Sequence, residues 1–366
     1  MLQAGLSSGM AATTGLNNSN RPPPVEAGFD GLAHVLPQNF VPEKSSRITL
    51  KGKKEDVKAS YLCIGGWPWG DTATWNFREE ERPSIRQAWE TCLANGVTYI
   101  DTAQVYGSGE SERICGALFQ GLKREDFVIQ TKWFMAPWSP TNILHPVDAP
   151  YRTLKESLER FRLDDIDVYL VHGHIHPQSI SSVAKGLAKC VDEGLTKAVG
   201  VANCSADDLI KMKEELAKYD VPLALNQYKY NVLRRHPETD GLLKTCRDNN
   251  IIFQSYSSLA MGRLSAKYGP ENEPPKQYRF SNYPMEEIEP TLNVLRDIAE
   301  QRGTSVSSVA LSYNLSKGVI PVVGVRSVEQ AEQNCKALGW RLNNEEIQRI
   351  DGVSFNGKKT ILWQQG

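Results

Sequence analysis

Several features that would place a chain in a specialised class are missing from this sequence. No apolar run approaches the roughly 20 residues that a membrane-spanning helix needs. The formal net charge is −1, so the basic surplus typical of nucleic-acid-binding proteins is absent as well. We therefore expect neither a membrane nor a nucleic acid as a partner. The composition, 40% hydrophobic and 23% charged, is that of an ordinary globular protein with a large core.

The cysteines lack the pattern of a disulfide-stabilised protein. Their number, seven, is odd, and none of them is part of a Cys-x-x-Cys pair. This pattern argues against a disulfide framework and favours a reducing compartment. The N-terminus also lacks a charged segment followed by an apolar one, so it does not predict a secretory signal. We expect the protein to be cytoplasmic.

The first 45 residues differ in composition from the rest of the chain. They are rich in Ser, Asn, Gly and Pro and include the run Pro22-Pro23-Pro24. Such a segment cannot bury enough apolar surface to fold, so we predict a mobile tail over residues 1–45. An organelle transit peptide is an alternative, which the single arginine before Pro22 does not favour. Residues 46–366 are predicted to form one domain.

Short apolar runs alternate with amphipathic segments along that domain. An opening hairpin is predicted from residues 49–50 and 57–61, which flank the turn-like Gly52-Lys53-Lys54. Buried parallel strands are predicted at 62–65, 99–102, 127–131, 166–171, 198–201, 223–226, 252–255 and 320–323. Helices are predicted at 84–95, 111–120, 150–162, 180–193, 206–219, 238–249, 290–302 and 328–338, with extra helices at 305–316 and 344–353.

Eight strands that alternate with helices favour a (β/α)8 barrel, also called a TIM barrel, within the α/β class. An open doubly wound sheet is the alternative, and it needs a glycine-rich turn after its first strand. The glycines found there, Gly65, Gly66 and Gly70, do not fit Gly-x-Gly-x-x-Gly. The sequence therefore predicts a closed barrel with an N-terminal hairpin and extra helices.

Barrel enzymes carry their chemistry where the strands end. Polar side chains follow seven of the predicted strands, in the order Asp101, Lys132, His172, Asn203, Gln227, Tyr256 and Arg326. Any one of them could simply be a strand end that meets water. An acid, a base and an imidazole on three successive strands instead indicate an active site.

These residues lie within segments that resemble motifs of the aldo-keto reductase family. The segments are IGGWPWG at 64–70, YIDTAQVYG at 99–107, QTK at 130–132, DVYLVH at 167–172, GVAN at 200–203, NQY at 226–228, SYS at 255–257 and IPVVG at 320–324. They occur in the family's order between about residues 62 and 338. Each motif is weak alone, whereas together they are specific.

The resemblance implies a catalytic set of Asp101, Tyr106, Lys132 and His172 and the reduction of an aldehyde or ketone. Hydride addition to a carbonyl creates an alkoxide, which Tyr106 would protonate as the general acid. A tyrosine of ordinary pKa, about 10, is a poor acid, and we expect the buried ammonium of Lys132 to lower that pKa. Asp101 would neutralise Lys132, and His172 would orient the substrate oxygen or share its proton. The alternative is a structural ion pair beside a loop tyrosine.

The resemblance also implies NADPH as the cofactor. Asn203 and Gln227 would hold the nicotinamide carboxamide, while Tyr256 would stack on the ring. Arg326, at the start of a helix, would bind the 2′-phosphate, although a solvated surface arginine is the alternative. The other predicted contacts are Gly66, Ser257, Leu259, Gly324, Gln330 and Asn334. The chain departs from the family's usual pattern at Ala202, Ser258, Ala260 and Gln333.

Aromatic residues are dense in the predicted rim. Trp67, Trp69, Trp133 and Phe134 are expected to form an apolar, partly open pocket for bulky or aromatic carbonyls. Ordinary packing beneath a long loop is the other interpretation. We expect a small-molecule carbonyl as the partner and a monomer or weak oligomer.

Three further patterns have alternative interpretations. The fold and the catalytic set also fit a regulatory module that binds a nicotinamide cofactor, such as the potassium-channel β-subunits. His172, His174 and His176 alternate, but Gly173 and Pro177 indicate a loop, so no metal site is predicted. The pairs Tyr151/Lys155 and Tyr313/Lys317 match the Tyr-x-x-x-Lys dyad of short-chain dehydrogenases, and we interpret both as surface pairs at helical spacing.

Overall fold

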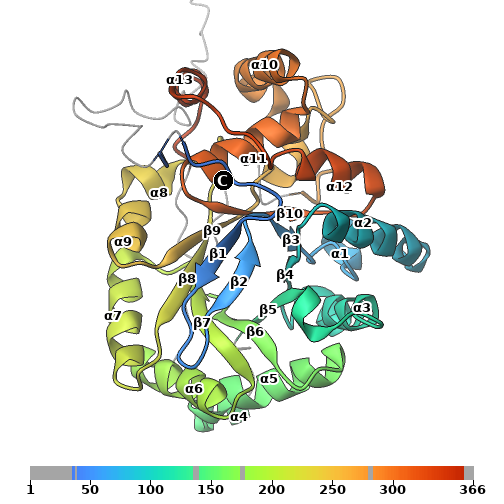
Figure 1. The fold of residues 1–366 in the computed structure, drawn as a ribbon. Coiled ribbons are helices and arrows are strands. Elements are labelled where there is room, and N and C mark those ends of the chain that lie inside the picture. Colours follow the sequence, from blue (N-terminus) through green and yellow to red (C-terminus); the bar gives the residue numbers. More distant parts are fainter. Residues whose placement is uncertain (1–34, 38, 135–139, 174–177, 279–282, 358–366) are drawn as a thin grey trace, which may run out of the picture.

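The computed structural model describes residues 35–37, 39–134, 140–173, 178–278 and 283–357. Its centre is a closed barrel of eight parallel strands in the order β10-β3-β4-β5-β6-β7-β8-β9 (Figure 1). The strands are β3 (Cys63–Gly65), β4 (Tyr99–Asp101), β5 (Val128–Trp133), β6 (Ile166–Val171), β7 (Thr196–Ala202), β8 (Leu223–Lys229), β9 (Ile252–Tyr256) and β10 (Ile320–Gly324). The predicted barrel is confirmed.

Helices surround the barrel on its outside (Figure 1). They are α1 (Thr72–Trp75), α2 (Arg82–Ala94), α3 (Glu110–Leu118), α4 (Pro140–Leu144), α5 (Asp148–Phe161), α6 (Ile180–Asp192), α7 (Ala206–Ala217), α8 (His236–Thr239), α9 (Leu242–Asp248), α10 (Met285–Arg302), α11 (Val306–Ser316), α12 (Val328–Cys335) and α13 (Asn344–Asp351). Short 3₁₀ helices occur at η1 (Glu79–Glu81), η2 (Tyr106–Gly109), η3 (Arg124–Asp126) and η4 (Ala260–Ser265).

Two predicted helices differ most from those in the structure. The segment predicted as one helix over 238–249 is divided into α8 and α9, because Gly241 between them has a positive φ of 82°. Helix α10 begins at Met285 rather than at Pro290, so this proline lies inside the helix.

Among the residues that the structure describes, no helix combines the length and the hydrophobicity that a membrane-spanning helix needs.

An antiparallel hairpin covers one end of the barrel (Figure 1). Its strands are β1 (Arg47–Leu50) and β2 (Val57–Ser60), close to the predicted bounds. Leu50, Val57 and Ala59 form one buried cluster with inward side chains near the strand starts, such as Tyr99 and Val128. The hairpin therefore closes the N-terminal end of the barrel and leaves the opposite rim for chemistry.

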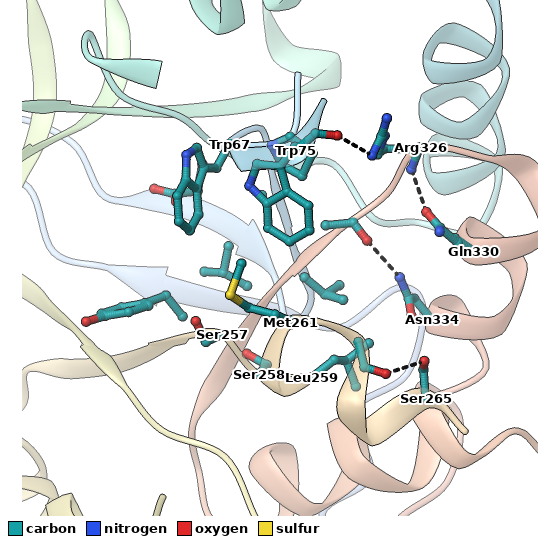
Figure 2. A pocket seen from close by; sticks show the side chains of 18 of the residues that line it. Trp67, Trp75, Ser257, Ser258, Leu259, Met261, Ser265, Arg326, Gln330 and Asn334 are labelled. Atoms are coloured by element: carbon teal, nitrogen blue, oxygen red, sulfur yellow. Dashed lines mark hydrogen bonds between the residues drawn. The ribbon is translucent and has the colours of Figure 1, made fainter. Parts of the chain in front are cut away.

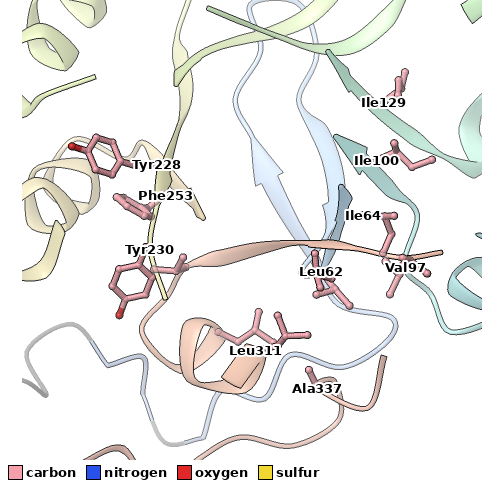
Figure 3. Packing of buried hydrophobic residues seen from close by; sticks show 14 of the residues in the cluster. Leu62, Ile64, Val97, Ile100, Ile129, Tyr228, Tyr230, Phe253, Leu311 and Ala337 are labelled. Atoms are coloured by element: carbon pink, nitrogen blue, oxygen red, sulfur yellow. The ribbon is translucent and has the colours of Figure 1, made fainter. Parts of the chain in front are cut away.

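The outward side chains of the strands form the larger core between barrel and helices (Figure 3). Ile64, Ile100 and Ile129 are register partners on β3, β4 and β5, and all three are fully buried in this cluster. Their neighbours Tyr99 and Val128 belong to the inner cluster instead. This alternation follows from the two-residue period of a strand and explains why the strand sequences are apolar on both faces.

Part of the predicted N-terminal tail is packed against the domain. The Leu36 amide donates to the Ser316 carbonyl at 2.8 Å, and the Gly339 amide donates to the Pro42 carbonyl at 3.0 Å. The Arg341 guanidinium also donates to the Leu36 carbonyl at 2.9 Å. Leu36 and Pro42 of the predicted tail therefore have hydrogen-bond partners at the end of α11 and after α12, while the domain boundary at residue 45 stays a prediction. Residues 1–34 lie outside the described residues.

One of the two Tyr-x-x-x-Lys pairs belongs to the interior. Tyr313 and Lys317 are fully buried, and the Lys317 ammonium lies 3.1 Å from both the Glu238 and the Asp351 carboxylates. The predicted surface pair is wrong here, because α11 is covered on all sides. Lys155 is exposed, and its ammonium lies 5.4 Å from the centre of the Tyr151 ring, as a surface pair requires.

Candidate active site

The four predicted catalytic residues meet at the open rim of the barrel. Asp101 ends β4, Lys132 lies on β5, and His172 directly follows β6. Tyr106 begins η2, in the turn that leads from β4 to α3. Parallel neighbouring strands bring their carboxyl ends to the same rim, so residues far apart in sequence become neighbours.

Lys132 is the centre of this group. Its ammonium donates to Asp101 Oδ2 at 2.8 Å, to the Thr102 carbonyl at 2.8 Å and to the Tyr106 hydroxyl at 3.3 Å. The three donors of the ammonium are thus all used. Burial by itself would lower the pKa of Lys132, but the charges of Asp101 and Tyr106 raise it above its usual value. Lys132 therefore stays charged, although it is fully buried.

Tyr106 departs from one expectation. Burial raises the pKa of its phenol above the ordinary value, and the charge of Lys132 opposes this only in part. The predicted lowering of the Tyr106 pKa is wrong, because the loss of hydration raises this pKa more than the Lys132 ammonium lowers it. Tyr106 consequently holds its proton at neutral pH, which suits a proton donor.

His172 packs edge-on against the Tyr106 ring, with ring centres 5.5 Å apart. A second edge-on contact joins it to Phe134 at 5.9 Å. Burial lowers the pKa of His172 well below its usual value, and the ammonium of Lys132 lowers it further. His172 is therefore a neutral imidazole at neutral pH, able to donate one hydrogen bond.

Buried amide side chains, which the sequence interpretation missed, connect Asp101 with Gln227 through hydrogen bonds inside the barrel. Gln130 Nε2 donates to Asp101 Oδ1 and also to Gln254 Oε1 at 2.8 Å. Gln227 Nε2 donates to the same Gln254 oxygen at 2.8 Å. The Tyr99 hydroxyl in turn donates to Gln130 Oε1. The inward position of Gln130 and Gln254 on their strands was the available signal.

A cavity of about 820 Å³ opens beside these residues. Of the catalytic set, Asp101, Tyr106 and His172 line it, while Lys132 lies behind them. The predicted cofactor residues that line it are Asn203, Gln227, Tyr256, Ser257, Leu259, Gly324, Arg326, Gln330 and Asn334. Figure 2 shows the part between Ser257 and Arg326. The cavity thus extends from the catalytic group to the start of α12.

The amides near the catalytic end are held in place. The Tyr256 hydroxyl donates to Asn203 Oδ1 at 2.9 Å, and the Asn203 backbone amide donates to the Gln227 carbonyl at 2.9 Å. Asn203 has a positive φ of 60°, a conformation that asparagine tolerates better than most residues. Ser205 caps α7, so Asn203 is not needed as the helix cap.

Arg326 lies at the other end and is already paired. Its guanidinium binds both carboxylate oxygens of Glu81, with Nε 2.8 Å from Oε2, and donates to the Trp75 carbonyl at 3.1 Å. The Gln330 side chain accepts from the Arg326 backbone amide at 2.8 Å, as Figure 2 shows. The alternative of a solvated surface arginine does not hold, since Arg326 lines the cavity.

Besides Lys132, three predicted site residues do not line the cavity. Trp69 and Trp133 are fully buried in the outer core, and the Trp69 indole donates to the Val325 carbonyl at 2.7 Å. Gly66 is tied to the Asp101 carbonyl through its amide, at 2.7 Å, and faces the Ser111 hydroxyl. These placements differ from the predictions, because Trp133 points outward from β5 as Ile129 does, and the turn after β3 directs Trp69 towards Val325. Trp67 and Phe134 do line the cavity.

The long connection after β9 supplies cavity walls that the sequence interpretation missed. Its members Met261, Lys267, Tyr268 and Tyr278 all line the cavity. The Tyr278 ring lies 4.7 Å from the Trp75 ring, and Trp75 in turn lies 5.6 Å from Trp67. A density of aromatic residues between two predicted elements was the only signal for this wall.

Metal binding has no support among the described residues. They contain no group of three His, Cys, Asp or Glu side chains that could hold a metal ion. His174 and His176 lie outside the described residues.

Known proteins are similar to this chain in sequence and in fold. The chain is 30% identical to the chloroplastic pyridoxal reductase of Arabidopsis thaliana over 326 residues, which cover 85% of this chain and 88% of that protein. It is 30% identical to the L-glyceraldehyde 3-phosphate reductase of Escherichia coli O157:H7, with 85% and 93% covered. An aldo-keto reductase of Schizosaccharomyces pombe, whose name includes NADP(+), is 27% identical, with 75% and 85% covered.

Among solved structures, a glycerol dehydrogenase from Gluconobacter oxydans superposes with a TM-score of 0.72 at 26% identity, covering 83% of this chain and 94% of that one. The model of the aldo/keto reductase family matches residues 61–354. That range includes the whole barrel and all four catalytic candidates. The chain is an oxidoreductase that belongs to the aldo/keto reductase family.

Proposed function

We propose that this enzyme reduces aromatic or otherwise bulky aldehydes and ketones to alcohols with NADPH, and that Tyr106 is the general acid. One observation carries this proposal. The Tyr106 hydroxyl lies 3.3 Å from the Lys132 ammonium at the wall of a large cavity, and the ion pair of Lys132 with Asp101 keeps that ammonium charged.

The donors and acceptors of the cavity fit NADPH. Asn203 and Gln227 offer amides to the nicotinamide carboxamide, and the Tyr256 ring lies on the same side of the barrel. Arg326 and the start of α12, which Ser327 caps, suit phosphate groups. The NADP(+) in the name of the Schizosaccharomyces pombe relative agrees with this assignment. When bound, NADPH supplies the hydride from C4 of its nicotinamide.

Residues of the chain would donate the proton to the substrate oxygen and stabilise the charge that remains. Tyr106 is protonated at neutral pH, so it can donate a hydrogen bond to the substrate oxygen and then give up its proton as charge develops there. The phenolate that remains would be stabilised by the Lys132 ammonium beside it. Neutral His172, in contact with the Tyr106 ring, would donate a second hydrogen bond to the same oxygen.

The cavity walls favour flat apolar substrates. Trp67 lies roughly parallel to the Tyr106 ring at 5.9 Å, and Phe134 packs on His172. A ring between such walls gains burial and aromatic contacts that a short polar aldehyde cannot make. The pyridoxal in the name of the Arabidopsis relative is an aromatic aldehyde, while the Escherichia coli relative is named for a small phosphorylated one.

Turnover with a set of carbonyls tests the proposal. We expect kcat/KM with NADPH to be higher for benzaldehydes and pyridoxal than for glyceraldehyde and glyceraldehyde 3-phosphate. Each additional buried methylene should contribute about 0.8 kcal/mol. Phe134→Ala should lower kcat/KM for the aryl substrates and leave glyceraldehyde nearly unchanged. A preference for glyceraldehyde would refute the substrate class, and no turnover on any carbonyl would favour the regulatory module.

We also propose that the enzyme is a monomer or weak oligomer in the cytoplasm. The reducing compartment that the cysteine pattern favours agrees with this location. Cell fractionation and size-exclusion chromatography at two concentrations test the two statements.

A further inference from the structure

Arg326, which lines the cavity at the start of α12, forms an ion pair with Glu81. Arg326 follows β10, and Glu81 ends η1 just before α2, so 245 positions separate the two in sequence. Two guanidinium nitrogens face the two carboxylate oxygens, which is the strong fork-to-fork geometry of an arginine–carboxylate pair. The side chains are only 24% and 17% exposed, so water screens the pair less than it would at the surface.

The same guanidinium is tied to the wall of the cavity. Its third nitrogen donates to the Trp75 carbonyl at 3.1 Å, and the Arg326 carbonyl accepts from the Ser84 hydroxyl at 2.8 Å. Residues 75–84 are thereby attached to the start of α12 at three points. Figure 2 shows Trp75 between Arg326 and Trp67, on the wall of the cavity. An anion that binds the Arg326 guanidinium must therefore displace Glu81 or the Trp75 carbonyl from it.

We propose that Glu81 is a specificity-determining residue that competes with the 2′-phosphate of NADPH for Arg326 and so reduces the preference of the enzyme for NADPH over NADH. This inference rests on the proposed placement of the 2′-phosphate at Arg326. A phosphate monoester and a carboxylate each present at least two anionic oxygens that can accept hydrogen bonds from the same guanidinium. The 2′-hydroxyl of NADH carries no charge and does not require the pair to open.

The charge of Glu81 should weaken the binding of NADPH. When the 2′-phosphate binds Arg326, the charge-assisted hydrogen bonds between Glu81 and Arg326 are lost. The Glu81 carboxylate then also lies close to the phosphate, which carries a charge of the same sign. Glu329, three positions after Arg326 in the sequence, lines the cavity and adds a second negative charge there. Removing the charge of Glu81 should therefore strengthen NADPH binding about tenfold, and it should leave NADH binding within about twofold.

Glu81→Gln tests this directly, because it keeps the shape of the side chain and removes its charge. Dissociation constants for NADPH and NADH are measured by isothermal titration calorimetry, together with those of the fragments 2′,5′-ADP and 5′-AMP. Glu79→Gln is the matched control: it removes the same charge from the same 3₁₀ helix, but Glu79 is 69% exposed and pairs with Arg82. We expect Glu79→Gln to change neither cofactor by more than twofold.

The double variant separates this inference from the placement on which it rests. If Arg326→Ala weakens NADPH and NADH equally, the 2′-phosphate does not lie at Arg326 and the placement is wrong. If Arg326→Ala weakens NADPH selectively, Glu81→Gln should strengthen NADPH alone, and this gain should vanish in Glu81→Gln/Arg326→Ala. A loss of NADPH affinity in Glu81→Gln would show that Glu81 orients Arg326 rather than competing for it, and would overturn the proposal. Unchanged affinity would overturn it too, and Glu81→Ala with a thermal melt guards against a variant that misfolds.

Discussion

The Lys132 ammonium lies 2.8 Å from the Asp101 carboxylate, and neither side chain is more than 4% exposed. The two residues come from neighbouring strands of the barrel, and the ion pair is directed at the Tyr106 hydroxyl. A buried charge without a partner is costly, so Asp101 is what allows a lysine to remain charged beside Tyr106. The same ion pair thus stabilises the barrel and holds a positive charge next to the Tyr106 hydroxyl.

Tyr106→Phe should remove the proton donor and keep the ring that packs on Trp67 and His172. General acid catalysis is worth about 10²–10⁴-fold, so we expect kcat to fall by that order. The dissociation constant for NADPH and the thermal midpoint should stay nearly unchanged. A variant that keeps more than half of its turnover would show that Tyr106 is not the general acid.

Lys132→Met should cost both stability and activity, since it leaves the Asp101 carboxylate buried without its partner. Breaking one half of a buried pair typically costs about 3–5 kcal/mol, which urea denaturation can measure. The double variant Asp101→Leu/Lys132→Met should recover much of that stability, because apolar groups replace both charges. Activity should stay low in both variants. If the double variant regains turnover, the pair is only structural.

His172 should make stability depend on pH below neutrality. Its pKa is lowered well below 6.5 in the folded protein by burial and by Lys132, so the unfolded chain binds a proton first as the pH falls. The contribution is complete above pH 6.5 and is lost as the pH falls towards the folded pKa, with a slope of at most about 1.4 kcal/mol per pH unit. Urea denaturation between pH 7.5 and 5.5 should therefore show a steeper loss for the natural protein than for His172→Gln. Equal slopes would contradict this origin.

Gln254→Leu should loosen the amide chain between Asp101 and Gln227. The substitution removes the oxygen that accepts from both Gln130 and Gln227. An unsatisfied buried donor costs about 1–3 kcal/mol, so the free energy of unfolding should fall by at least that amount. Because Gln227 lines the cavity, the dissociation constant for NADPH should also rise. Loss of stability with unchanged NADPH binding would show that the chain serves the barrel alone.

The sequence by itself determined the barrel and the rim position of the catalytic candidates, because both depend on local patterns. Apolar runs of strand length recur between amphipathic segments, and the residue that ends each run must reach the rim once the barrel closes. Asp101, Lys132 and His172 could therefore be placed together without coordinates. Trp67 and Phe134 followed by the same reasoning.

Only the tertiary structure decided which side of each element a neighbouring residue faces and what it pairs with. Trp69 lies two positions from Trp67, yet it packs in the core because the turn after β3 directs it towards Val325. Lys317 looked like a surface partner of Tyr313, but the packing of α11 buries it between two acids. Arg326 was predicted to bind a phosphate, whereas in the fold its guanidinium is paired with Glu81, from the segment just before α2. Such pairings depend on distances in space between segments far apart in the chain, which a single sequence does not encode locally.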